Sequence, residues 1–335
     1  MNKELSAGKR AELDRIIEEA SNGTGVVQPE VRVKFTYEGP KVRKKDGKDT
    51  TVDNAGVFLL SDLHIGTLLP DFNDTYAWRK ERLTNVVDNL LHILRYHYPV
   101  KTLHLGILGD IMQGQENYAQ QVTESDHEHK QIISAVKMVA EALIRLIDGC
   151  FTMGTGVEVL EVTGNHGKTS YMRSRNRDNH EATIYAWLND ILTGRYPGLK
   201  IETDLNYIIK EVEGLTMLFE HGDGISMYMN LPYYGIGRRI DRMRGRTGKM
   251  INVYNIGHFH SFNQLTINGA TVFMTGTLHE DSDLSYRLGL LPDTKFWYYT
   301  CHKGRIGAEF GIYADRIDHE VVCGDKNNKP QGVVS

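Results

Sequence analysis

From residue 56 onward, short apolar runs alternate with long stretches in which apolar residues recur at every third or fourth position. The short runs have the length of strands, and the long stretches have the spacing of helices that bury one face. We predict helices over 75–99, 129–149 and 179–192, and strands at 56–62, 103–110, 157–165, 215–223 and 251–260. Strands that alternate with helices indicate an α/β fold whose strands are largely buried on both faces.

The two ends of the chain follow a different pattern. Residues 4–20 have the spacing of a short amphipathic helix, 31–37 form an expected strand, and the basic run KVRKKDGK predicts a loop or hairpin. Shorter runs over 261–314 indicate hairpins or a meander. We therefore expect three parts, namely an N-terminal accessory extension over 1–50, a main domain over 51–317 and a peripheral C-terminal tail over 318–335.

The composition changes this picture little. With 40% hydrophobic and 24% charged residues among 335, the chain is typical of soluble proteins. The net charge of −4 provides no overall attraction to nucleic acid or membranes. No stretch approaches the roughly 18 apolar residues of a membrane span, and the polar start is unlike a signal sequence. Three scattered cysteines disfavour a disulfide framework. We expect a cytoplasmic protein with no membrane partner, and the composition leaves its oligomeric state open.

All five predicted strands end in side chains that bind metals. In α/β sheets, binding sites form where the carboxyl ends of strands meet. Each ending taken singly has a structural explanation, such as a turn, a cap or a hydrogen-bonded core histidine, but turns do not need histidine. The repetition at five strand ends therefore favours a functional cluster. Its members are Asp62, His64, Asp110, Asn165, His166, His221, Asp223, His258 and His260.

This mixture of side chains suits hydrolysis at phosphorus. Two divalent cations held about 3.5–4 Å apart can clamp the attacking and leaving oxygens of a displacement. Cations so close together need an anionic bridge, so we expect a shared carboxylate. Histidine and carboxylate without thiolate favour Mn²⁺, Fe or Zn²⁺ over Ca²⁺. Such ions lower the pKa of a bound water and supply hydroxide at neutral pH.

The motifs SDLHIG, LGD, GNH, EHGD and GHFH follow one another in this order. Together they resemble the motifs of the calcineurin-like metallophosphoesterases, over roughly residues 56–280. The resemblance implies a four-layer α/β/β/α sandwich with two divalent metal ions at one edge, Mn²⁺ before Fe or Zn²⁺. It implies one ion bound by Asp62, His64 and His260, a second bound by Asn165, His221 and His258, and Asp110 as the bridge.

The same resemblance implies that His166 is catalytic, because it matches the position that contacts the phosphate and protonates the leaving oxygen. The family commonly carries Asp or Glu directly after this histidine, whereas Gly167 stands here. A carboxylate that would orient the imidazole is therefore missing from that position, which weakens proton donation more than phosphate contact. The GNHG variant is similar to that of bacteriophage-encoded members.

The resemblance leaves several substrates open. Protein Ser/Thr phosphatases of this superfamily carry an arginine soon after Gly-Asp, whereas this chain has amides in GDIMQGQENY. DNA-repair nucleases of the Mre11 and SbcD type are compatible with this, as are small-nucleotide or cyclic-nucleotide phosphodiesterases and phosphatases. A catalytically inactive scaffold is disfavoured, because such a protein should lack at least one ligand.

Basic segments favour the nuclease, with DNA as substrate. Clusters at 41–48, 168–177 and 238–249 attract a phosphate backbone even when the net charge is negative. Tyr228, Tyr233 and Tyr234 precede the third cluster and are candidates to stack on bases. The alternative is that these segments are solvated surface or pair with acids near residue 281. The predicted nucleic-acid contacts are Lys168, Arg173, Arg175, Arg238, Arg239, Arg242 and Arg244.

Overall fold

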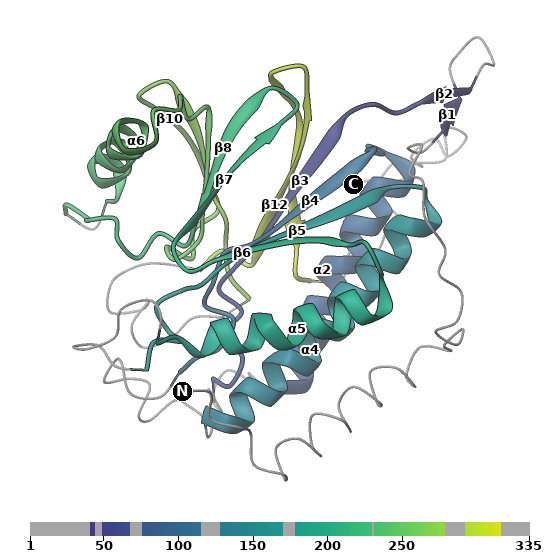
Figure 1. Ribbon diagram of the computed structural model, residues 1–335, viewed down its shortest axis with the longest axis horizontal. Coiled ribbons are helices and arrows are strands. Elements are labelled where there is room, and N and C mark those ends of the chain that lie inside the picture. Colours follow the sequence, from purple (N-terminus) through teal and green to yellow (C-terminus); the bar gives the residue numbers. More distant parts are fainter. Residues whose placement is uncertain are drawn as a thin grey trace, which may run out of the picture.

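The computed structural model describes residues 41–43, 49–67, 76–114, 128–169, 178–229, 231–278 and 292–315. Within them, two β-sheets pack face to face, and helices cover the outer face of each sheet (Figure 1). This arrangement confirms the predicted α/β class and the four-layer α/β/β/α sandwich.

The larger sheet has six strands in the order β13-β12-β3-β4-β5-β6. Strands β3, β4, β5 and β6 are parallel to one another. Strand β12 pairs antiparallel with β3, and β13 pairs antiparallel with β12. Its strands are β3 (Ala55–Leu60), β4 (Thr102–Ile107), β5 (Gly156–Val162), β6 (Lys200–Asp204), β12 (Lys295–His302) and β13 (Arg305–Tyr313). Three helices cover one face, namely α2 (Tyr76–Tyr96), α4 (Glu128–Thr152) and α5 (His180–Arg195) (Figure 1).

The smaller sheet has five strands in the order β10-β11-β9-β8-β7. Its three central strands are parallel, and both edge strands pair antiparallel. The strands are β7 (Tyr207–Val212), β8 (Leu215–Glu220), β9 (Val253–Ile256), β10 (Asn263–Ile267) and β11 (Ala270–Met274). Helix α6 (Tyr233–Thr247) packs on the outer face.

Three apolar layers hold the sandwich together. One lies between the three helices and the larger sheet, and includes Leu90 and Val139. A second joins the inner faces of the two sheets, where the ring of Phe273 stacks on that of Tyr299 at 4.2 Å between centroids. The third lies under α6 and includes Ile240. Because the central strands are buried on both faces, their sequences are continuous apolar runs.

The three predicted helices and the five predicted strands are confirmed, with ends that differ by a few residues. The pattern missed β6, β7, β12 and α6. In α6 the buried stripe is short, with Ile236, Ile240 and Met243 as its large apolar members, and arginines dominate the sequence around it. Strand β6 has no buried residue and so leaves no apolar run.

Strands β1 (Lys41–Arg43) and β2 (Asp49–Thr51) pair antiparallel, so the basic run is part of a hairpin. Strand β2 crosses the predicted boundary after residue 50, and the three-part division stays a prediction. The expected helix over 4–20, the expected strand over 31–37 and the tail over 318–335 lie outside the described residues. Among the helices of the described part, none is both long and apolar enough to span a membrane.

A polar contact also joins the two sheets. Lys210 on β7 donates a 2.5 Å hydrogen bond to Glu158 on β5, and Nδ1 of His104 on β4 lies 3.1 Å from the same carboxylate. The His104 imidazole and the Lys210 ammonium lower the pKa of Glu158 to about 2, although burial acts in the opposite direction. The ionised carboxylate therefore stabilises the folded state.

We expect Glu158→Gln to lower the Tm at pH 7, because the variant lacks the ionised carboxylate. The decrease should be only about 2–4 °C, because the contact is partly exposed. The folded pKa lies below the ordinary value of 4.5, so the stabilisation is complete above that pH. It is lost as the pH falls from about 4.5 to about 2. Thermal unfolding followed by circular dichroism across this range should show the wild-type and variant curves converging. A difference in Tm between the wild type and the variant that stays constant down to pH 3 would contradict a stabilising role of the ionised Glu158 carboxylate.

Candidate metal centre

The carboxyl ends of β3, β4, β5, β8 and β9 meet at one edge of the sandwich, and a predicted ligand follows each of them. Backbone hydrogen bonds hold the loops together there. His64 N–H donates to the carbonyl of Asp110 at 2.9 Å, and Gly257 N–H donates to the carbonyl of His221 at 2.9 Å. The fold thus brings together side chains separated by up to 198 positions, from Asp62 to His260.

Five of the seven predicted ligands have left-handed backbone conformations. Residues with a side chain avoid this region at a cost of about 1–3 kcal/mol, and such residues cluster where function requires a particular side-chain direction. The concentration at one sheet edge is therefore a mark of a functional centre. The φ angles are 54° at Asp62, 45° at His64, 50° at Asp110, 67° at His258 and 50° at His260.

The glycines beside the ligands are required for space. A Cβ on Gly164 would lie 2.1 Å from Oδ1 of Asp110, and one on Gly257 would lie 2.0 Å from Oγ of Ser61. Neither glycine has a positive φ, so the requirement for glycine at these positions comes from space and not from an unusual backbone conformation. The absence of a side chain lets the ligand loops approach one another.

The side chains of the first expected ligand set, Asp62, His64 and His260, lie close together. Nε2 of His64 lies 3.0 Å from Nε2 of His260, and Oδ1 of Asp62 lies 3.3 Å from the latter and 3.8 Å from the former. Within the described part of the chain, this buried Oδ1 accepts no hydrogen bond of normal geometry. A buried carboxylate oxygen that faces two imidazole nitrogens fits a metal ion.

The second set converges around His221. Its Nε2 lies 3.0 Å from Oδ1 of Asn165, 3.0 Å from Oδ2 of Asp110 and 3.2 Å from Nδ1 of His258. Metal–ligand bonds of about 2.1 Å place neighbouring ligand atoms about 3.0–3.4 Å apart. The separations around His221 and two of the three in the first set therefore fit the donors of a divalent ion.

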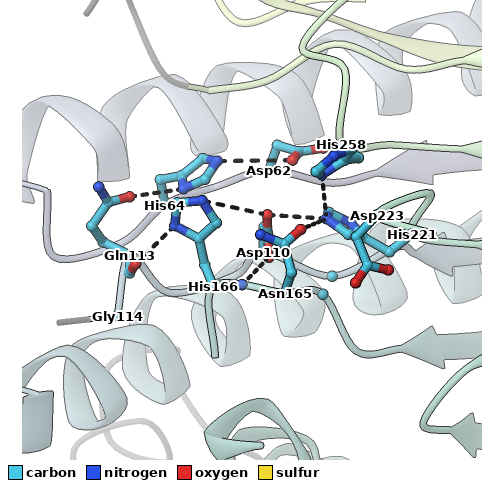
Figure 2. Close-up of polar contacts among 12 residues, drawn as sticks. Asp62, His64, Asp110, Gln113, Gly114, Asn165, His166, His221, Asp223 and His258 are labelled. Carbon is cyan, nitrogen blue, oxygen red and sulfur yellow. Dashed lines mark hydrogen bonds and ion pairs between the residues drawn. The ribbon is translucent and has the colours of Figure 1, made fainter. Parts of the chain in front are cut away.

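Asp110 lies between the two sets. It forms one close group with His64 and His166 and another with His221 and His258. Figure 2 shows its carboxylate in the middle, with His64 and His166 on one side and His221 on the other. This position fits the bridge implied by the motifs, and the ligand role of all seven residues stays a prediction.

Two acceptor groups outside the seven expected ligands fix the imidazole rings. Nδ1 of His64 donates to Oε1 of Gln113 at 2.8 Å, and Nδ1 of His221 donates to the carbonyl of Leu108 at 2.6 Å. An acceptor at Nδ1 requires the proton there and leaves Nε2 free to bind a metal. Gln113 stands three residues after Asp110, and this proximity is the signal by which it could have been found.

His166 is oriented by the backbone. Its Nδ1 donates to the carbonyl of Gln113 at 2.8 Å, and its N–H donates to Oδ1 of Asp110 at 2.8 Å (Figure 2). Nε2 lies 4.0 Å from Oδ2 of Asp110, and the side chain is 21% exposed. A carbonyl thus holds the ring where a carboxylate was expected, so the orientation of the ring does not depend on a side chain at position 167.

Burial and neighbouring charges shift the pKa values of the side chains in this centre. Burial opposes ionisation of Asp62 and Asp110, but the surrounding imidazoles hold the pKa of each carboxyl well below its usual range. Burial also disfavours protonated His221, yet the Asp110 carboxylate raises the pKa of His221 to about 10. Burial, together with the His221 charge, lowers the pKa of His258 to about 4. A metal ion that binds His221 must therefore displace a proton.

The predicted nucleic-acid contacts divide into two groups. Lys168 pairs with Asp223 at 2.5 Å, and Arg239 donates to both carboxylate oxygens of Glu220 at 3.0 and 2.5 Å. Arg244 donates to two backbone carbonyls at 2.7 Å each. By contrast, Arg238 and Arg242 are exposed on α6. Arg173, Arg175 and the acids near residue 281 lie outside the described residues.

No protein-family model and no curated protein matches the chain. Among solved structures, an archaeal phosphodiesterase is 12% identical, with a TM-score of 0.35 over 76% of this chain and 99% of that one. A predicted phosphoesterase from Streptococcus pneumoniae TIGR4 is 12% identical (TM-score 0.32, 78% and 99%). Zinc-bound Vps29 from Entamoeba histolytica is 11% identical (TM-score 0.32, 77% and 99%). Similarity at this level does not transfer activity, so function must be inferred from the side chains of the centre.

We expect Asp110→Asn to retain the fold but to bind one Mn²⁺ fewer than the wild type, because a neutral amide cannot offset two adjacent cations. The rate of phosphoester hydrolysis should fall at least about a hundredfold. Metal content after equilibrium dialysis, together with the rate, tests this expectation. Asp88→Asn is the matched control, because Asp88 lies on α2, where it pairs with Arg145, and belongs to none of the three ligand groups of the described residues. Two bound ions and full activity in Asp110→Asn would refute the bridge.

Proposed function

We propose that this protein is a dimetal-dependent phosphoesterase that hydrolyses phosphodiester bonds, most favourably in DNA. The observation that carries the proposal is the position of Asp110, which forms one close group with His221 and His258 and another with His64 of the first ligand set and His166. The donors are carboxylate, amide and imidazole without thiolate, which supports Mn²⁺, with Fe or Zn²⁺ as alternatives. Two such ions, when bound, supply Lewis-acid activation of the phosphorus centre.

The protein's own groups then have distinct tasks. Asp110 contributes the negative charge between the two ligand sets, and the Leu108 carbonyl and Gln113 keep the imidazole donors aimed inward. His166 keeps its Nδ1 proton on the Gln113 carbonyl, which leaves Nε2 directed at the centre. From there it can bind a phosphate oxygen or, when protonated, give a proton to the leaving oxygen.

Support for a nucleic-acid substrate comes from α6 and the segment that precedes it. Arg238 and Arg242 stand one turn apart, so their exposed side chains share a face of the helix. Tyr228 and Tyr234 are 65% and 69% exposed, with ring centroids 6.3 Å apart. Exposed tyrosines beside arginines suit a single strand whose bases stack while its phosphates are neutralised. This supports the nuclease branch, with which the motifs are compatible.

A small-nucleotide phosphodiesterase is the second candidate, and a hollow of about 250 Å³ beside the centre favours it. The hollow is open to solvent, and its volume suits a single nucleotide better than a polymer. Its charged walls are the Lys168–Asp223 and Arg239–Glu220 pairs. An inactive scaffold has no such support, because none of the seven expected ligands is replaced.

We expect His166→Ala to keep both metal ions and to lower the rate by about 10²–10⁴. A phosphodiester with a good leaving group should lose less activity than one with a poor leaving group if His166 donates a proton. Steady-state rates on a matched pair of aryl phosphodiesters measure the difference. Equal losses on both substrates would restrict His166 to phosphate binding, and an unchanged rate would remove it from the site.

We expect replacement of both Arg238 and Arg242 by alanine to weaken DNA binding and to reduce its salt slope by about two units, one per phosphate contact. Hydrolysis of a small chromogenic phosphodiester should stay unchanged, because such a substrate cannot span the centre and α6. Fluorescence anisotropy of single-stranded DNA at several salt concentrations gives both quantities.

The matched control replaces Lys303, in the turn after β12, and Arg305, the first residue of β13, both of which are exposed. That turn lies at the opposite end of the sheet, because the last residues of β12 pair with the start of β3. The control removes the same charge and should leave the slope unchanged. An equal loss in both variants would show a general charge effect. Undiminished binding in the α6 variant would favour the small-nucleotide candidate.

A further inference from the structure

Glu181, in the first turn of α5, is fully buried and joins the loops that carry two of the expected ligands. Its Oε1 accepts a 2.5 Å hydrogen bond from the N–H of Ile111, the residue after Asp110. Its Oε2 accepts a 2.5 Å hydrogen bond from the N–H of Gly164, the residue before Asn165. One carboxylate thus spans the ends of β4 and β5.

The N-cap of α5 reinforces this link. Oδ1 of Asn179 accepts a 2.9 Å hydrogen bond from the N–H of Glu181, which fixes the start of the helix. Nδ2 of the same amide donates to the carbonyl of Gly164 at 2.7 Å. Both backbone groups of Gly164 are therefore bound by side chains from the start of α5, and the position of Asn165 depends on this helix.

The same two side chains explain Gly167. A Cβ at this position would lie 2.3 Å from Oδ1 of Asn179 and 2.7 Å from Cγ of Glu181. The φ angle of Gly167 is not positive, so the restriction comes from space alone. The position where the motif resemblance leads one to expect Asp or Glu is bare because a carboxylate from α5 fills the neighbouring volume.

A carboxylate in this place is costly. Burial, together with the nearby charge of Asp110, raises the pKa of Glu181 to about 7. An apolar residue of the same size would avoid both costs and fill the same space, but it could not accept hydrogen bonds from two separate backbone amides. The unfavourable burial therefore indicates that the two acceptor oxygens have a specific task.

We propose that Glu181 is a positioning residue that clamps the β4 and β5 loops, so that Asp110 and Asn165 are held at a distance at which both bind the same ion. Its side chain also occupies the space beside Gly167, although the His166 ring itself is held by the Gln113 carbonyl. The proposal rests on the proposed metal centre, but it concerns a residue outside the expected ligands and outside all five motifs.

Glu181→Gln tests the clamp with almost no change in shape. The amide keeps one acceptor and turns an NH₂ group toward the second backbone N–H, so one loop loses its hydrogen bond. We expect the affinity for the second Mn²⁺ in calorimetric titration to fall about 10–100-fold, as for other residues that support ligands. The kcat on a small phosphodiester should fall with it, while KM changes little.

Gly167→Ala is an independent second variant. It retains the Glu181 carboxylate but pushes it aside with one added methyl group. It should weaken the binding of the second Mn²⁺ in the same way, and its effect should not add to that of Glu181→Gln because both variants act on one contact. If Glu181→Gln does not fold, as judged by circular dichroism and Tm, Gly167→Ala carries the test.

Glu161→Gln is the matched control. Glu161 is also fully buried, but it accepts hydrogen bonds from Thr203 at 2.6 Å and Asn189 at 3.2 Å, away from the ligand loops. This control should alter the Tm and leave Mn²⁺ affinity unchanged. Equal weakening of Mn²⁺ in both variants, or unchanged affinity in Glu181→Gln, would overturn the clamp and leave the metal centre standing. A wild-type protein that binds no Mn²⁺ would overturn both proposals.

Discussion

The Asp110 carboxylate is the group on which the rest of the centre depends. One of its oxygens accepts the N–H of His166, and the other lies 3.0 Å from Nε2 of His221. Gly164 must lack a side chain because that carboxylate occupies the adjacent volume. A buried negative charge of this kind is stable only among positive partners. Imidazolium supplies them in the metal-free molecule, and divalent ions would do so in the proposed active form.

The sandwich makes such a concentration of polar groups possible because its apolar layers lie elsewhere. The inner faces of the two sheets bury Phe219 and Phe273, and the helices bury a second layer against the larger sheet. The cost of five left-handed residues is therefore concentrated at one edge, where the strand ends leave the packed core. Rigid strands behind the loops hold the ligand side chains in one place, as catalysis at a fixed pair of ions requires.

Around the centre, positive charge is divided between structure and surface. Arg239 and Arg244 hold α6 against Glu220 and against backbone carbonyls, whereas Arg238 and Arg242 face solvent. The basic segment of α6 is thus neither wholly solvated surface nor wholly a binding site. Arg239 donates hydrogen bonds to Glu220, the residue before His221, and this contact fixes α6 relative to the centre. A substrate bound on the surface of α6 would therefore be held in a defined position relative to the centre.

The sequence by itself determined the α/β class and the side chains that gather at the sheet edge, because strand periodicity and the residues at strand ends are local properties. It also predicted that His166 belongs to this cluster, and the fold places its side chain beside those of His64 and Asp110. Only the tertiary structure decided what holds these groups. The Leu108 and Gln113 carbonyls orient imidazoles without any sequence signature, since every residue has a carbonyl. Glu181 lies in the first turn of α5, and the sequence pattern of a helix does not distinguish a buried glutamate from an exposed one. Its partners, like those of Arg239, are distant in sequence, and only packing of the sheets and helices brings them within hydrogen-bonding distance.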